Sequence, residues 1–216
     1  MKIPPKNILL IDKPKGITSY DVIRRLKKKY PKQKIGHAGT LDPLATGLLV
    51  VGVGAGTKLL KDLIGLSKEY EAEILLGLST TTGDMEGVII EEKKVDMVGH
   101  TDLKNVLSGL TGKLSLRVPV YSAIKQRGEP LYKKARRGEK VETPVREMEI
   151  YKIDLLDVFR YKKYFVVKIG IKVKSGVYIR SVAEEIGNRL GVPATIKELR
   201  RTKVGEYSVE NAENIE

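Results

Sequence analysis

A glycine-rich segment, residues 36–47, constrains this 216-residue chain more than any other feature of its sequence. It reads Gly-His-Ala-Gly-Thr-Leu-Asp-Pro-Leu-Ala-Thr-Gly, and an apolar run at 48–53 follows directly. Glycine adopts backbone angles that other residues avoid and proline fixes φ, so such a loop can hold one side chain in a defined position. The carboxylate inside the loop is Asp42. Two interpretations are open: an Asp-Pro pair that closes a surface turn, or a carboxylate fixed for nucleophilic attack.

The net charge of the chain indicates which class of molecule the protein binds. The chain has 40 Lys and Arg against 27 Asp and Glu, a net charge of +13. Such a field attracts polyanions, of which nucleic acid is the commonest. A lysine-rich proteome would give the same total, but here the cations cluster at 24–34, 123–140 and 200–203. The basic residues of the central cluster are Lys125, Arg127, Lys133, Lys134, Arg136, Arg137 and Lys140. These clusters predict salt-dependent binding to a phosphate backbone.

Composition also excludes several classes of site. The chain has no cysteine, which rules out disulfides, thiol catalysis and cysteine-based zinc sites. Its two histidines, His37 and His100, lie far apart in the sequence, so we expect no histidine metal site. No apolar run reaches membrane-spanning length, and the first residues lack the apolar region of a secretory signal. We therefore expect a cytoplasmic protein that does not bind membranes.

Periodicity predicts one mixed α+β domain over residues 1–216. We expect strands at 7–11, 48–53, 69–74 and 167–173, and helices that begin near residues 19, 102 and 179. Alternation in the third strand places Tyr70 on its inward face. Residues 118–147 show no clear period and are very basic, which is typical of a long functional loop with helical turns.

Four polar or aromatic residues besides Asp42 are candidates for a site. Arg180 is expected in the first turn of a helix, where the helix dipole disfavours a cation, so a partner carboxylate is expected; the alternative is a solvated surface charge. The alternative for Tyr70 is an aromatic side chain of the core, and the alternative for His37 is an ordinary loop histidine. Asp84 is interpreted as a structural residue at a pocket edge, with a catalytic-loop acid as the alternative.

Six motifs stand in a fixed order along the chain. They are LLIDKP at 9–14, GHAGTLDPLATG at 36–47, KEY at 68–70, YSAIK at 121–125, GVYIRS at 176–181 and LRR at 199–201. In this order they closely resemble the bacterial TruB family of tRNA pseudouridine synthases, from Asn7 to about Glu210. The resemblance implies the pseudouridine synthase catalytic fold, a mixed and largely antiparallel sheet with flanking helices.

The resemblance also implies roles for individual residues. Asp42 corresponds to the catalytic nucleophile, Tyr70 to the active-site tyrosine, and Arg180 to the arginine that pairs with the nucleophile. The supporting positions are His37 for the flipped-out nucleotide, Leu199 for the pocket wall, and Lys13 with Pro14 as a buttress of the Asp42 loop. Residues 121–147 correspond to a mobile RNA-gripping insertion, in which we expect Lys133, Lys134, Arg136 and Arg137 to meet phosphates.

The family isomerises uridine 55 in the TΨC loop of tRNA to pseudouridine, a reaction that needs no metal and no cofactor. We expect this activity, without a cofactor, from a monomer that has no obligate protein partner. This sequence departs from the family's pattern in two places. Thr81 stands where the family often has an acid, and the chain ends at Glu216, where many members continue into a C-terminal RNA-binding domain of the PUA type. We therefore expect RNA binding to depend on the basic surface and on the 121–147 loop. The alternatives are a tRNA-binding or tRNA-folding protein with secondary catalysis, and a synthase for another structured RNA.

Overall fold

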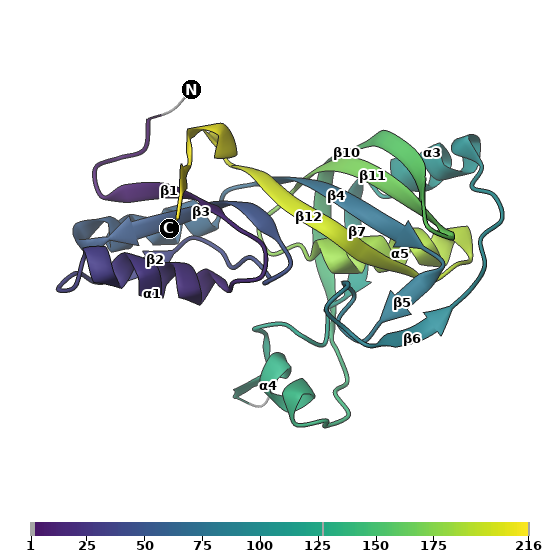
Figure 1. Ribbon diagram of the computed structural model, residues 1–216, viewed down its shortest axis with the longest axis horizontal. Helices are drawn as coiled ribbons and strands as arrows, with labels where there is room; N and C mark the ends of the chain where they lie inside the picture. The colour runs from purple at the N-terminus through teal and green to yellow at the C-terminus, as the bar shows by residue number, and fades with distance from the viewer. Residues whose placement is uncertain (1–2, 127, 216) are drawn as a thin grey trace. The chain divides into compact units, whose positions relative to one another are not determined.

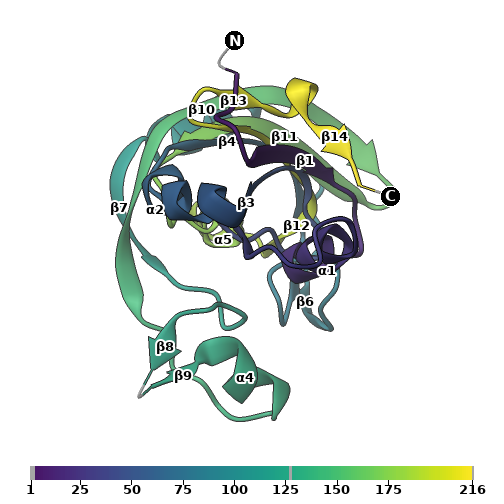
Figure 2. The same cartoon turned by 90° about the vertical axis from the view of Figure 1, so that its left-hand side faces the viewer.

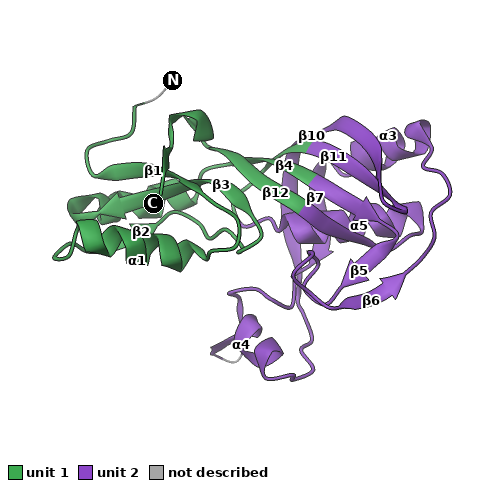
Figure 3. Ribbon diagram, viewed as in Figure 1, with its two compact units in different colours: residues 1–72, 170–175, 198–216 green, residues 73–169, 176–197 purple. Residues whose placement is uncertain are grey.

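The computed structural model describes residues 3–126 and 128–215 of the chain (Figure 1). It divides into two compact units, coloured separately in Figure 3: unit 1 comprises residues 1–72, 170–175 and 198–216, and unit 2 comprises 73–169 and 176–197. Arg127, counted in the central basic cluster, lies outside the described residues. No helix in the described parts is long and apolar enough to cross a membrane.

Unit 1 is built on a sheet with the strand order β14-β1-β3-β12-β4-β11. Its elements are β1 (Ile8–Lys13), α1 (Ser19–Lys29), β2 (Ile35–His37), β3 (Thr46–Val53), η1 (Gly54–Leu59), α2 (Leu60–Ile64), β13 (Tyr207–Ser208), η2 (Val209–Asn211), β14 (Glu213–Asn214) and parts of β4, β11 and β12. β1 pairs antiparallel with β3, with Leu10 opposite Val50. β12 (Ala194–Val204) runs parallel to β3, with Arg201 opposite Gly47.

Strand β3 lies in the core of unit 1 because both of its faces are covered. One set of alternate residues, Leu49, Val51 and Val53, packs against the apolar face of α1. The other set packs in a cluster with Leu60, the first residue of α2. Burial on both faces accounts for the unbroken apolar run in the sequence, which alternation alone would not give.

Unit 2 contains the strand order β12-β4-β11-β10-β7. Its strands are β4 (Lys68–Leu76), β5 (Leu78–Thr80), β6 (Ile89–Glu92), β7 (Gly112–Arg117), β8 (Lys125–Gln126), β9 (Glu129–Pro130), β10 (Val145–Tyr161) and β11 (Tyr164–Val173), of which β4 and β11 also contribute to unit 1. Its helices are α3 (His100–Ser108), α4 (Leu131–Arg136) and α5 (Ile179–Leu190). Figure 2 shows β8, β9 and α4 following one another in the basic segment.

The α+β class and the largely antiparallel sheet are confirmed. Thr18 caps α1 in a capping box with Asp21, and α5 ends where Gly191 adopts a left-handed conformation at φ 70°. The basic segment differs from the expected loop, because it holds the β8–β9 hairpin and β10 begins at Val145. Antiparallel pairing of β10 with β7 fixes this strand, an interaction between distant segments that no local pattern reveals. A single catalytic domain over residues 1–216 stays a prediction.

Candidate active site

The Asp42 loop connects β2 to β3 in unit 1, and Asp42 itself is half-buried. Backbone hydrogen bonds fix the loop at both ends: Ala38 N donates to Val50 O at 2.8 Å, and Ala45 N donates to Asp42 O at 3.1 Å. Gly47 has a φ of +100°, and a Cβ there would lie 2.3 Å from the carbonyl oxygen of Arg201. A glycine is therefore required where the loop enters β3 against β12.

Ser19, the first residue of α1, holds the residue that precedes Asp42. Its Oγ donates to the carbonyl oxygen of Leu41 at 3.0 Å and accepts from the Leu41 N–H at 2.8 Å. Ser19 is 2% exposed and Leu41 is 3% exposed. Both backbone groups of Leu41 thus obtain a partner away from water, which a buried peptide group requires.

Two buried cations hold the rest of the loop through its carbonyl oxygens. Lys13 Nζ donates to Pro43 O at 3.3 Å and to Ile17 O at 2.7 Å. Arg201 donates from Nη2 to Gly39 O at 3.1 Å, from Nη1 to Thr40 O at 3.4 Å and from Nε to Leu48 O at 2.7 Å. Lys13 and Arg201 are at most 1% exposed. We call Lys13, Ser19 and Arg201 the loop clamp.

Two members of the loop clamp were missed by sequence reasoning. Ser19 was identified only as part of a helix start, and Arg201 only as part of the LRR motif. A serine at a helix start and an arginine in a strand are each compatible with buried polar contacts, but neither identifies the loop as the partner. Lys13 was expected to buttress the Asp42 loop, and its bond to Pro43 joins it to that loop.

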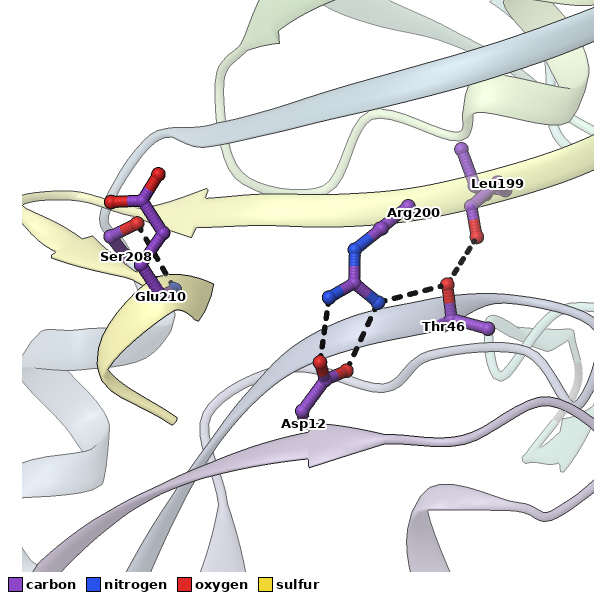
Figure 4. Close-up of polar contacts among 6 residues, drawn as sticks. All are labelled: Asp12, Thr46, Leu199, Arg200, Ser208 and Glu210. Atoms are coloured by element: carbon purple, nitrogen blue, oxygen red, sulfur yellow. Dashed lines mark hydrogen bonds and ion pairs between the residues drawn. The ribbon is translucent and has the colours of Figure 1, made fainter. Parts of the chain in front are cut away.

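Leu199 lies on β12, next to a polar contact that joins three strands (Figure 4). Arg200 forms a two-pronged ion pair with Asp12, with Nη2 at 2.6 Å from Oδ2 and Nη1 at 3.1 Å from Oδ1. Thr46 Oγ1 accepts weakly from Arg200 and donates to the Leu199 carbonyl oxygen, both at 3.4 Å. The 8% exposed Leu199 is thereby fixed beside the end of the Asp42 loop.

His37, the last residue of β2, is half-buried. Its Nδ1 is buried and has no hydrogen-bond partner among the described residues. Burial, and after it the positive charge of Arg201, lower the pKa of His37 below its usual 6.5. Both effects favour the neutral form of the imidazole.

Tyr70 lies on β4 and is half-buried. The expected alternation holds around it, with Ala72 buried and Glu71 exposed. Its neighbour Glu69 forms ion pairs with Lys172 at 3.3 Å and Lys203 at 3.2 Å. Tyr70 is thus not enclosed as a fully buried core aromatic would be.

Arg180 belongs to unit 2 and lies in the first turn of α5, as expected. It is 6% exposed, so the alternative of a solvated surface charge is wrong. Its Nη1 donates to Thr82 O at 2.8 Å and its Nη2 to Tyr121 O at 2.9 Å. The guanidinium therefore links α5 to the first residue of the 121–147 segment. Its pairing with Asp42, a residue of unit 1, stays a prediction.

Asp84 lies in a turn with Thr82, whose carbonyl oxygen accepts from Arg180. It is 4% exposed, and its Oδ1 accepts from Thr82 Oγ1 and from Glu86 N at 3.1 Å. These contacts within three residues favour the structural interpretation over that of a catalytic acid.

The four basic candidates of the 121–147 segment lie on α4 or just after it, in unit 2. Lys133 and Arg136 are exposed, and Lys134 is half-buried. Arg137 differs, because Nη1 and Nη2 donate to the two carboxylate oxygens of Glu129 at 2.6 and 2.8 Å, and Nε donates to Glu139 at 2.7 Å. These bonds, that to Glu129 first, raise the pKa of Arg137. Arg137 thus stabilises the segment itself.

Comparison with known proteins agrees with the six motifs. Residues 27–179 match the model of the TruB family pseudouridylate synthase (N terminal domain). A tRNA pseudouridine synthase B of Corynebacterium diphtheriae is 38% identical over 212 residues, which are 97% of this chain and 71% of the relative. Another, of Fusobacterium nucleatum, is 47% identical over 205 residues, 95% of this chain and 70% of the relative.

Solved structures show the same fold. A Cbf5-Nop10-Gar1 complex matches with a TM-score of 0.71 and 28% identity, over 96% of this chain and 52% of that one. An H/ACA RNP bound to a substrate RNA containing 2'-deoxyuridine matches with a TM-score of 0.69 and 27% identity, over 96% and 50%. The chain therefore belongs to the TruB family of pseudouridylate synthases.

Proposed function

We propose that the protein is a tRNA pseudouridine synthase that isomerises uridine 55 of the TΨC loop, with Asp42 as the nucleophile. The observation that carries this proposal is the loop clamp, because Lys13, Ser19 and Arg201 fix the backbone on both sides of Asp42. A reacting group must be held close to its productive geometry, and a buried set of hydrogen bonds supplies that rigidity. The names of the bacterial relatives support tRNA as the substrate.

The reaction is an isomerisation in which the N1–C1′ bond breaks, the uracil turns, and C5 bonds to C1′. The Asp42 carboxylate starts it by adding either to C1′ of the ribose, with N1 as the leaving group, or to C6 of the uracil. The bond from Asp42 to that carbon breaks again before the product leaves, which regenerates the carboxylate. C5 then loses its proton so that the ring regains its conjugation, and N1 gains one, so atoms balance without any redox step. A base must take the C5 proton, and we assign Tyr70 to this step or to the orientation of the base.

The uridine must leave its RNA loop before it can react. Flipping a nucleotide out costs on the order of a few kcal/mol, which contacts in the pocket must offset. We propose that His37, neutral and with a buried Nδ1, supports the flipped nucleotide, and that Leu199 forms part of the wall of its pocket.

Arg180 is proposed to pair with Asp42. A neighbouring cation favours the charged form of a carboxylate, which is the form that attacks. The bonds of Arg180 to the carbonyl oxygens of Thr82 and Tyr121 support this role, because they orient the guanidinium and connect it to the proposed RNA-gripping segment. Within that segment we assign phosphate contacts to Lys133, Lys134 and Arg136, with a smaller part for Arg137.

We further propose that the protein acts as a monomer without a protein partner, in the cytoplasm, where tRNA is available. The solved relatives are named as complexes with Nop10 and Gar1 or as an H/ACA RNP, yet they are 27–28% identical to this chain. The bacterial tRNA enzymes are 38–47% identical. This difference favours tRNA over a guide-directed RNA substrate.

Tritium release from unmodified tRNA labelled at C5 of uridine, followed by mapping of the product, tests the proposal. We expect wild-type protein alone to modify one uridine, and a transcript with cytidine at position 55 to release none. Asp42→Asn should abolish release, whereas Asp62→Asn, an exposed carboxylate on α2, should behave like wild type. Full activity of Asp42→Asn would refute the nucleophile. Binding of tRNA without any modification would support the tRNA-folding alternative.

A further inference from the structure

The last two turns of α1 present an unbroken basic surface. Between residues 24 and 29 every exposed position is a lysine or arginine, and Leu26, the remaining residue, is buried. Two more exposed lysines follow before β2. We call this set the α1 basic face: Arg24, Arg25, Lys27, Lys28, Lys29, Lys32 and Lys34.

Most of this charge has no counter-charge within the described part of the chain. Asp21 pairs with Arg24, and Arg25 makes a long hydrogen bond of 3.5 Å to the Ile215 carbonyl oxygen. Among the residues that the structure describes, no carboxylate lies in ion-pair distance of the five lysines. Elsewhere exposed lysines are often paired, as Lys94 is with Asp96. The dipole at the end of α1 favours cations only over its last turn, so the cluster as a whole is self-repelling.

The position of α1 in unit 1 connects this charge to the Asp42 loop. The helix begins at Ser19, which holds Leu41, and the segment after it leads directly into β2 and His37. The five cations at 24–29 span about 8 Å of helix axis, or roughly one charge per 1.5 Å. Double-stranded DNA carries about one phosphate charge per 1.7 Å of its axis when both strands are counted, so the charge density of the helix is of the same order as that of a duplex.

We propose that the α1 basic face binds the phosphate backbone of the RNA stem that adjoins the flipped uridine. The inference rests on the proposed function, because it assigns part of the tRNA footprint to unit 1. It adds a second phosphate-binding surface to the 121–147 segment, which belongs to unit 2. In this arrangement the α1 basic face binds the stem, and the Asp42 loop contacts the flipped nucleotide.

Two triple variants with the same change in charge test this assignment. The first is Lys27→Gln, Lys28→Gln and Lys32→Gln on the face. The matched control is Lys6→Gln, Lys61→Gln and Lys104→Gln, three exposed lysines from the N-terminal segment, α2 and α3. The dissociation constant for an unmodified tRNA transcript is measured by filter binding between about 50 and 200 mM salt. Removing one lysine–phosphate interaction should flatten the log–log salt slope by about 0.7–0.9, so the face triple should flatten it by about 2–3.

We expect the weaker binding to appear as a higher KM for tRNA, and the control triple to keep the wild-type slope. A face triple with arginine in place of each lysine should also keep it. If thermal unfolding shows that the glutamine triple is misfolded, the three single variants replace it, each with a slope change of about 0.7–0.9. Equal slopes for face and control variants, with wild-type modification intact, would overturn this inference alone. A wild-type protein that neither binds nor modifies tRNA would overturn the proposed function as well.

Discussion

Replacing Ser19 by alanine tests whether the loop clamp fixes the catalytic geometry. The change removes one oxygen and leaves the N–H and C=O of Leu41 without their partner, 2.8 and 3.0 Å away in the native protein. Both groups are buried, since Ser19 and Leu41 are 2% and 3% exposed. A buried polar group without a partner costs about 1–3 kcal/mol, so the two together cost about 2–6 kcal/mol of unfolding free energy.

Two measurements follow from this magnitude. For a chain of this length, each kcal/mol lowers the melting temperature by about 2–4 °C, so we expect a fall of about 4–24 °C. Because Leu41 directly precedes Asp42, kcat on tRNA should fall by at least about tenfold, since small misplacements of reacting groups are costly. KM should change less, because the RNA-binding surfaces are untouched.

The control is Ser108→Ala. Ser108 is also in a helix, but it is exposed and its Oγ donates to Asn105 O at 2.9 Å within the same helix. Its unfolding free energy should stay within about 0.5 kcal/mol of wild type. Equal melting temperatures for Ser19→Ala and this control would refute the clamp. A destabilised Ser19→Ala with wild-type kcat would show instead that the clamp stabilises the fold without positioning Asp42.

Three further predictions concern other residues. Gly47→Ala should be severely destabilised in urea unfolding, because its Cβ would lie 2.3 Å from the Arg201 carbonyl oxygen at a φ of +100°. The control variant Gly176→Ala should lose less unfolding free energy, because nothing lies within 4 Å of a Cβ at that position. Burial, and then the charge of Arg201, lower the pKa of Lys68 from 10.5 to about 8. Between these pH values the folded state binds fewer protons than the unfolded state, so the unfolding free energy should rise with pH across that window. The Lys68→Met variant should not show this rise. Arg137→Ala should weaken tRNA binding less than Lys133→Ala, because Arg137 is already paired with Glu129; an equal effect of both variants in a binding titration would contradict this.

The parts of the fold that sequence predicted are those that local patterns specify. The helix at Ser19–Lys29 has its capping residue and apolar face within a short stretch of chain, and α5 ends at a glycine. The basic segment was less well predicted, because β10 depends on pairing with β7 and not on its own periodicity.

The loop clamp was beyond sequence reasoning for the same reason. Ser19 and Leu41 are 22 positions apart, and Arg201 reaches carbonyl oxygens 153 to 162 positions earlier in the chain. For Arg180, the unfavourable helix position predicted a partner carboxylate, which stays a prediction. The described partners are the carbonyl oxygens of Thr82 and Tyr121, which no residue type in the sequence identifies.

Arg201 connects the geometry of the site with its electrostatics. Its guanidinium donates to the carbonyl oxygens of Gly39, Thr40 and Leu48 and is 1% exposed, so it brings a positive charge into the interior beside the Asp42 loop. The same charge contributes to the lowered pKa of His37 and of Lys68. The residue that fixes the loop thus also sets the electrostatics around it, because its buried charge disfavours the protonated forms of His37 and Lys68.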